Sequence, residues 1–288
     1  MFKIYTDTSA NLPAEIMQNY DLEEIPLHYT VNGEEFPSSE ESKAEFDGKL
    51  FYSAMRNGAE VKTDMINTSA FCDAFEKSLV LGIDIIYIGM SSGLSGTYHA
   101  SVKAAEEMRE RYPLRKIATI DTLAASLGEG LPVLFAARLK EGGASFEEVV
   151  TLTQKNSASI CQYFTVEDLM YLKKGGRVSS ATAILGNILQ IKPILMGDND
   201  GMIVLNHNAR GRKKALEALV KKYQELVSDM NAPVGIAHGD CVEDAEHLAQ
   251  RLRESGHQGE TLICYYEPVT GSHVGPGTVA LFFYGIHR

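Results

Sequence analysis

The sequence predicts an α/β protein of two lobes, with a mostly parallel sheet in the first lobe and a mixed sheet in the second. Short apolar runs alternate with helical patterns through the first half of the chain, as in parallel sheets covered by helices on both faces. Beyond about residue 157 the pattern changes to a hairpin and late strands. We therefore expect lobes at 1–155 and 156–288, each with its own core, and a ligand site in the cleft between them.

The first lobe alternates strands with helices. Strands are predicted at residues 2–7, 23–31, 83–90 and 115–122. Helices are predicted at residues 9–20, 42–58, 68–82, 97–112 and 124–142. Pro13 lies in the first turn of the first helix and Gly58 closes the second, which are positions that these residue types favour.

The second lobe is expected to be less regular. Strands are predicted at 159–166, 232–240, 260–269 and 278–285, with a hairpin over 192–210 that turns at Asp200 and Gly201. Helices are predicted at 167–176, 215–227 and 242–256. Between Arg177 and Lys192 the chain carries no charged residue. This segment is either a buried core helix or one wall of an apolar cavity, where a long acyl tail would contribute on the order of 10 kcal/mol.

Composition excludes several classes of protein. A hydrophobic content of 44% and a charged content of 23% are typical of a globular protein, and no run approaches the ~20 apolar residues that span a bilayer. The start of the chain lacks the basic and apolar regions of a signal peptide, so we expect a cytoplasmic location without stable membrane insertion. The four cysteines are scattered, which favours reduced thiols over disulfides or a zinc site.

The charge argues against nucleic acid as a partner. The net charge is −11, whereas phosphate backbones are bound by basic faces. Positive charge is nevertheless concentrated at residues 173–177 and 210–214. Each of these clusters is either a solvated face or a docking patch for an acidic partner.

Residues 89–93 fit G-x-S-x-G, the pattern of a hydrolase nucleophile elbow. Ser91, Asp240 and His273 would supply a triad in the chain order of the α/β-hydrolases. An elbow requires the helix to begin at the serine, but the segment SGLSGT intervenes and no H-G-G-G segment is present. The pattern therefore favours a serine that is not catalytic.

The same loop has the composition of an anion-binding turn. Ser95 or Thr97 is the expected N-cap of the following helix, whose free N–H groups and dipole attract phosphate or carboxylate. A capped turn without a ligand would have the same sequence. Thr63 lies in an expected loop before a helix that is capped by Asn67 or Thr68.

A glycine-rich loop is predicted at 270–277, with His273 in its middle. Glycine permits close approach of the backbone to a ligand, and a histidine there can donate to an anion, act as an acid or base, or brace a tight turn. His238 and Asp240 without a second cluster do not predict a metal site, and residues 197–201 lack the distal glutamate of a calcium loop. The motifs G-x-x-x-x-G-K-[ST] and G-x-G-x-x-G, which bind nucleotides, are absent.

Six segments of the chain together resemble the DegV family. They are YTDTSANLP near the N-terminus, SSGLSGTYHAS, DTLAASLGEG, LKKGGRVSSA, IKPIL and the closing GSHVGPGTVALFF. Their order and spacing are similar to those of the family over essentially the whole chain. The resemblance implies two α/β lobes that hold a long-chain fatty acid between them. It also implies a role in bacterial phospholipid metabolism, as the acyl-carrying subunit that presents the carboxylate to a separate fatty acid kinase.

The resemblance further implies roles for individual residues. Thr63 resembles the threonine that hydrogen-bonds the fatty acid carboxylate, and Ser95 its partner serine, with the backbone of Gly96 beside it. His273 resembles the histidine near the head group, and Arg177 the basic residue that engages the kinase. One segment departs from the family, because its T-S-Q-P is TDMI in this chain. The change adds a negative charge beside the threonine and removes a proline.

The predicted function is therefore that of a fatty-acid-binding protein that is not an enzyme, with a long-chain fatty acid as its ligand, no other cofactor and no metal. A fatty acid kinase is the expected protein partner. Two alternatives stay open. One is a serine hydrolase that uses Ser91 and His273, and the other is a small-molecule phosphotransferase with the anion-binding turn as its phosphate site.

Overall fold

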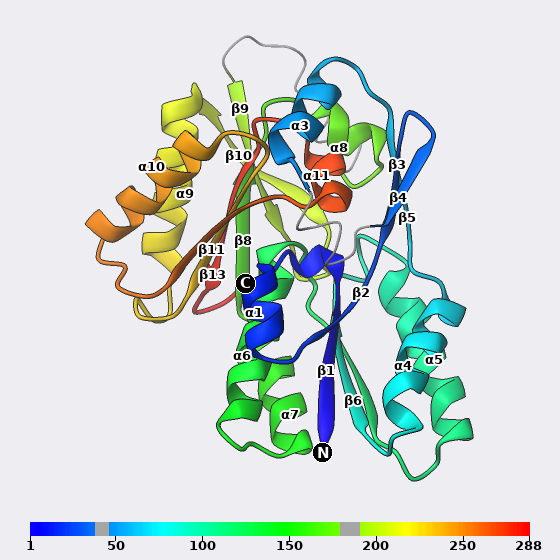
Figure 1. The fold of residues 1–288 in the computed structure, drawn as a ribbon. Coiled ribbons are helices and arrows are strands. Elements are labelled where there is room, and N and C mark those ends of the chain that lie inside the picture. The colour runs from blue at the N-terminus through cyan, green and yellow to red at the C-terminus, as the bar shows by residue number, and fades with distance from the viewer. Residues whose placement is uncertain (38–45, 179–190) are drawn as a thin grey trace.

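A computed structural model describes residues 1–37, 46–178 and 191–288. The first lobe is built on sheet A, which has the strand order β2-β1-β6-β7 (Figure 1). These strands are Phe2–Asp7 (β1), Glu23–Ile25 (β2), Asp84–Gly89 (β6) and Ile117–Asp121 (β7). All three strand pairs are parallel, as the alternation of strands and helices predicts.

The second lobe is built on sheet C, with the order β10-β9-β8-β13-β11-β12. Its strands are Ile160–Thr165 (β8), Ile191–Gly197 (β9), Ile203–Arg210 (β10), Val234–His238 (β11), Thr261–Tyr265 (β12) and Val279–Tyr284 (β13). The β11–β12 pair is parallel and the other pairs are antiparallel, so the sheet is mixed as predicted. The β9–β10 hairpin turns over residues 198–201, as expected.

A third, small antiparallel sheet was not predicted. It has the order β4-β3-β5 and consists of His28–Val31 (β3), Glu34–Pro37 (β4) and Val61–Asp64 (β5). The predicted strand at 23–31 is in fact two strands in different sheets, because Pro26 lies between them and proline has no N–H to donate to a ladder. The expectation of a loop at Thr63 was wrong, since Thr63 belongs to β5 and pairs with Tyr29 of β3.

The helices cover the sheets in layers (Figure 1). They are Ala14–Asn19 (α1), Gly48–Arg56 (α3), Thr68–Leu79 (α4), Thr97–Arg111 (α5), Leu127–Glu141 (α6), Phe146–Ser157 (α7), Met170–Lys174 (α8), Arg212–Leu226 (α9), Val242–Glu254 (α10) and Pro268–Val274 (α11). Helices α4 and α5 cover one face of sheet A, and α6 and α7 the other. Helices α9 and α10 cover one face of sheet C, while α6 packs against strands β11 and β13. Helix α6 therefore contacts both sheets and joins the lobes.

Strand β6 shows why this arrangement needs a continuous apolar run. Ile85 and Tyr87 belong to the core formed with α4 and α5, whereas Ile86 and Ile88 belong to the core formed with α6. Successive side chains of a strand face opposite sides of its sheet. A strand covered on both faces is therefore apolar at every position.

Two carboxyl groups are buried together where β1 ends against α6. Ser9 Oγ lies 2.6 Å from Asp7 Oδ1 and also contacts Glu129, whose other oxygen accepts from Thr6 Oγ1 at 2.9 Å. Tyr87 OH donates to Asp7 Oδ2 at 2.6 Å. Burial raises the pKa of Glu129 well above its usual value, and the negative charge of Asp7 raises it further. A protonated Glu129 satisfies the Ser9 contacts, since that hydroxyl has a single proton to donate.

The free energy of unfolding of the wild type is expected to fall as the pH rises toward neutral, and Glu129→Gln is expected to abolish this decrease. Unfolded glutamate ionises near about pH 4.3, whereas the folded protein keeps this proton to higher pH, so the free energy of unfolding of the wild type falls as the pH rises. Relative to wild type, the variant should gain about 1–3 kcal/mol between pH 5 and pH 7.5 in urea unfolding, at roughly 1.4 kcal/mol per pH unit. The exposed Glu246→Gln is the matched control. An equal difference from wild type at both pH values would show that Glu129 is ionised in the folded protein.

Candidate functional site: an apolar cavity between the lobes

A cavity of about 310 Å³ lies between the two lobes, within the range of about 300–1,000 Å³ that is usual for small-molecule sites. Strands β8, β10 and β13 of the second lobe line it, as do β5 and the segments that precede α5 and α6 of the first. Most of the lining side chains are apolar. They include Met90, Leu94, Phe164, Ile203, Val269 and Phe282.

Polar groups from several elements also line this cavity, beginning with Thr63 and His273. Thr63 Oγ1 and His273 Nε2 are hydrogen-bonded at 2.9 Å. Gly175 packs against the other side of the ring, where a Cβ atom would lie 2.4 Å from Nδ1. The imidazole therefore lies between the hydroxyl of Thr63 and the backbone of Gly175. A larger residue at position 175 would displace the ring.

Arg177 follows α8 and lines the same cavity. Its Nε donates to the carbonyl of Leu94 at 3.2 Å and its Nη1 to the carbonyl of Gly175. Within the described part of the chain it forms no ion pair, and burial lowers its pKa. A guanidinium that is partly withdrawn from water without a carboxylate partner is costly unless an anion lies nearby. Arg177 therefore carries a positive charge beside the cavity that no described residue neutralises in an ion pair.

The start of helix α5 supplies further donors. The prediction of Ser95 or Thr97 as the N-cap of this helix was wrong, since the N-cap is Gly96. The Ser95 hydroxyl instead accepts from the N–H of Thr97 at 3.2 Å and contacts the Thr97 hydroxyl at 2.9 Å. The N–H of Gly96 has no hydrogen-bond partner among the residues that the structure describes. Ser95 and Gly96 both line the cavity. An unpaired N–H at the N-terminus of a 15-residue helix favours an anion.

The histidine of this group is neutral at physiological pH. Burial and, second, the positive charge of Arg177 lower the pKa of His273 to about 4. A neutral imidazole has one donor and one acceptor. With Nε2 bonded to Thr63 and Nδ1 against Gly175, His273 can orient the Thr63 hydroxyl toward a carboxylate while Arg177 supplies the charge. Neither role changes between pH 6 and pH 8.

The predicted loop at 270–277 is largely helical, which corrects the expectation for His273. Helix α11 spans Pro268–Val274, and His273 lies in its last turn. The helix begins here because Glu267 caps it by accepting from two backbone N–H groups and Pro268 occupies its first turn. The backbone turns only afterwards, at Gly275, whose φ is 82°. The four residues predicted to bind the ligand, Thr63, Ser95, Gly96 and His273, all line one cavity. Arg177, which was predicted to engage the partner, lines it too.

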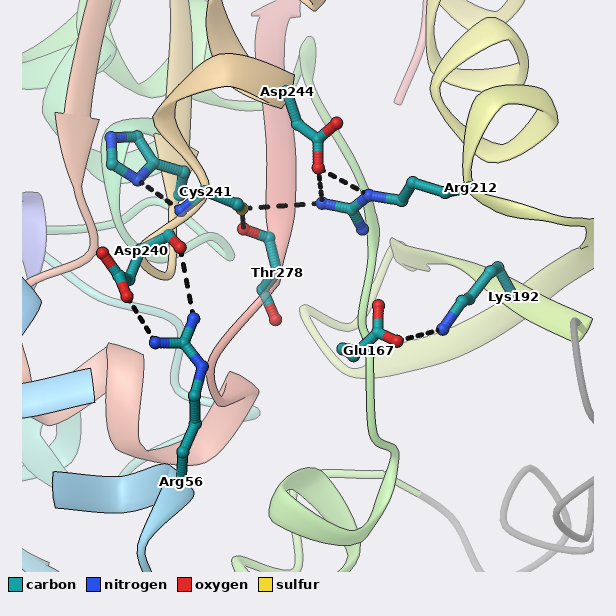
Figure 2. A network of polar contacts seen from close by, with 9 residues as sticks. Arg56, Glu167, Lys192, Arg212, Asp240, Cys241, Asp244 and Thr278 are labelled. Atoms are coloured by element: carbon teal, nitrogen blue, oxygen red, sulfur yellow. Dashed lines mark hydrogen bonds and ion pairs between the residues drawn. The ribbon is translucent and has the colours of Figure 1, made fainter. Parts of the chain in front are cut away.

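The side chains of the hydrolase alternative have separate partners. Ser91 is fully buried, and its Oγ donates to the carbonyl of Gly201 at 2.9 Å. Asp240 pairs with Arg56 of α3, as Figure 2 shows, and His273 is bonded to the threonine described above. These contacts do not form a Ser–His–Asp relay. The Arg56–Asp240 pair instead ties α3 to the segment after β11.

The second basic cluster, at 210–214, is partly neutralised. Arg212 Nη2 lies 2.8 Å from Asp244 Oδ2 and donates to Cys241 Sγ at 3.5 Å (Figure 2). Lys213 and Lys214 are exposed. Arg212 therefore has a structural role, and the exposed Arg210, Lys213 and Lys214 are available as a solvated or docking surface.

The described residues contain neither a candidate metal site nor a membrane-spanning helix. Within 1–37, 46–178 and 191–288, no three His, Cys, Asp or Glu residues are placed to hold a metal ion. No helix in these ranges is long and apolar enough to cross a bilayer. The uncharged segment that was expected to form a core helix or a cavity wall lies mostly at 179–190, outside the described residues.

An outer cavity of about 820 Å³ adjoins the inner one. The two share the residues Thr63, Asp64, Arg177 and His273. Exposed residues such as Lys62, Asp168 and Lys174 line the rest of the outer cavity. The polar groups of the inner cavity are therefore reached from a wide polar groove.

Sequence reasoning missed other residues that line the inner cavity. Ala125 and Ser126 lie at the start of α6, and Gln162 lies on β8. A signal was available for Gln162, since it is the one amide in an otherwise apolar run. Nothing in the local sequence distinguishes Ala125 from an ordinary core alanine.

The fold and this cavity define a two-lobe α/β protein with an apolar interior site lined in part by anion-binding groups. The model of a family described as "Uncharacterised protein, DegV family" matches residues 1–285. A DegV domain-containing protein of Clostridium perfringens is 40% identical over 285 residues, which cover 99% of this chain and 97% of that protein. The chain belongs to the DegV family.

Solved structures of the family share the fold. A DegV lipid binding protein from Thermotoga maritima is 30% identical, with a TM-score of 0.85 and full coverage of both chains. A DegV family protein from Thermus thermophilus, whose structure is described by its fatty acid binding, is 27% identical with a TM-score of 0.87 over 99% of each chain. The family resemblance in the sequence and the predicted two-lobe fold are thus confirmed.

Proposed function

We propose that this protein binds a long-chain fatty acid in the inner cavity and presents its carboxylate to a separate fatty acid kinase. One observation carries the proposal: an apolar cavity between the lobes is bordered by Arg177, a cation that forms no ion pair with the described residues, beside hydroxyls and a neutral imidazole. A molecule with a long apolar tail and one anionic end matches both features. The relatives from Thermotoga maritima and Thermus thermophilus, described as binding lipid and fatty acid, support it.

Tail and head group contribute in different ways. Each buried methylene contributes about 0.8 kcal/mol, so a long tail supplies most of the affinity. The carboxylate must keep hydrogen-bond partners when it leaves water, because an unpaired buried anion is costly. Thr63, Ser95 and the N–H of Gly96 supply these partners, His273 orients the Thr63 hydroxyl, and Arg177 supplies the charge.

The outer cavity supports presentation of the carboxylate to a partner. Arg177 lines both cavities, so it can contact the carboxylate from one side and an approaching protein from the other. The sequence carries neither of the two common nucleotide-binding motifs. The kinase therefore supplies the phosphoryl donor, and this chain, in the cytoplasm, acts as the acyl carrier without an activity of its own.

Thr63→Val and Ser95→Ala are each expected to weaken palmitate binding about tenfold, the effect of one lost hydrogen bond to a charged group. Thr63→Val preserves the shape of the side chain and removes only its hydroxyl. Affinity is measured by displacement of a fluorescent fatty acid, with thermal melting to show that each variant is folded. Ser92→Ala, in the same loop but outside the cavity lining, is the matched control. If Thr63→Val and Ser95→Ala both bind palmitate as tightly as the wild type, the head-group assignment is wrong.

A further inference from the structure

Gln162 is a buried amide in the apolar part of the inner cavity. It lies on β8 with an exposed fraction of 6% and lines the cavity. Phe164, two residues further along the strand, lines it too, because alternate residues of a strand face the same side. The residue paired with Gln162 on β13 is Phe282, another lining residue. Two phenylalanines thus flank the amide on the cavity face of the sheet.

Most of the hydrogen-bonding capacity of this amide is unused. A glutamine side chain can donate two hydrogen bonds and accept two. Gln162 Nε2 donates to the carbonyl of Leu123 at 3.4 Å, which is long for such a bond. Across residues 1–37, 46–178 and 191–288, no hydrogen bond reaches its Oε1, and none joins it to Thr63 or His273. A polar group in an apolar cavity is stabilised when a ligand or water completes its hydrogen bonds.

The sheet is shaped to hold the amide in this place. Gly197 of β9 lies beneath it, and a Cβ atom at that position would lie 1.8 Å from Gln162 Nε2. A glycine inside a strand weakens the strand, and it often marks a point of close approach. Here Gly197 leaves room for the amide. The position of the Gln162 side chain therefore depends on a glycine at residue 197.

We propose that the preferred ligand is a long-chain fatty acid with a hydroxyl group on its acyl chain, and that Gln162 recognises this hydroxyl. A hydroxyl donates to Oε1 and accepts from Nε2, which completes the amide. The inference rests on the proposed function, because the carboxylate must be held by the residues around Thr63 and His273. A site that pairs with a substrate hydroxyl discriminates strongly against the analogue that lacks it, since the polar group of the site is then left unpaired.

The test compares stearate with a series of monohydroxystearates that differ in the position of the hydroxyl. With the delipidated wild-type protein, one positional isomer should bind at least about tenfold more tightly than stearate, because only one position brings the hydroxyl to the amide. Gln162→Met, which preserves the length of the side chain, should abolish the preference and bind stearate at least as tightly as the wild type. Gln162→Leu is a second variant of the same kind. Tyr163→Phe, on the opposite face of β8 and outside the cavity lining, is the control and should keep the preference.

The outcomes separate this inference from the proposed function. If stearate binds the wild type and every hydroxystearate binds more weakly or equally, recognition of a hydroxyl is wrong and fatty acid binding stands. A preference that persists in Gln162→Met and Gln162→Leu would also overturn it. If neither palmitate, stearate nor any hydroxystearate binds the wild type, the proposed function itself fails.

Discussion

Arg177→Gln is expected to weaken palmitate binding about 30- to 100-fold and to change the binding of 1-hexadecanol by no more than about twofold, because it removes a charge-assisted contact worth roughly 2–3 kcal/mol. Arg177 is partly buried, is held by two backbone carbonyls and forms no ion pair with the described residues. The acid and the alcohol have the same tail. The ratio of their affinities therefore isolates the contribution of the charge, and calorimetric titration of the delipidated protein measures it.

Lys174→Gln is the control for Arg177→Gln. Lys174 is an exposed cation on α8 that lines only the outer cavity, so its loss should leave both affinities unchanged. Equal loss of acid and alcohol binding in Arg177→Gln would mean that the variant damages the cavity wall. Unchanged palmitate binding would leave Arg177 with only the kinase contact that the family resemblance implies.

Ala125→Leu is expected to shorten the tail that the cavity accepts. Ala125 is 7% exposed and lines the inner cavity, so three added carbons occupy space that the ligand needs. The displacement of about three methylenes at about 0.8 kcal/mol each lowers the affinity for stearate roughly 50-fold. Affinities for acids of ten to eighteen carbons measure this, and those of the shorter acids should approach the wild-type values.

Ala218→Leu makes the same change on α9, away from the cavity, and should leave the chain-length series unchanged. The assignment would be contradicted if the affinity of Ala125→Leu rose with each added methylene, up to the acid of eighteen carbons, by as much as that of the wild type. The tail would then lie elsewhere.

The fold was largely predictable because its signals are local. The apolar run of β6 indicates a strand buried on both faces, and the change of pattern after residue 157 indicates a different sheet. The small β4-β3-β5 sheet was missed because one residue, Pro26, divides what looks like a continuous strand. Helix α7 was not predicted, although the capping box of Ser145 and Glu148 marks its start. The division into lobes at residue 155 remains a prediction, since α6 packs against both sheets.

The candidate site was predictable only in part. The family motifs indicated Thr63, Ser95 and His273, and these residues do line one cavity. Their local structure was harder to predict, because a strand pairing that spans more than 30 residues places Thr63 and a capping glutamate places His273. Gln162 and Ala125 were missed because the local sequence does not show whether a buried residue lines a cavity or packs in a core. That depends on residues that are distant in the sequence. The roles of all these residues in binding remain predictions.

The most direct test of the account is mass spectrometry of the purified protein after denaturation and solvent extraction. We expect about one long-chain fatty acid per protein molecule, since a tail buried in an apolar cavity dissociates slowly. After delipidation, the protein should take up added palmitate to the same ratio. Trace amounts of lipid in the extract, together with no uptake of added palmitate or stearate, would contradict fatty acid binding by this protein.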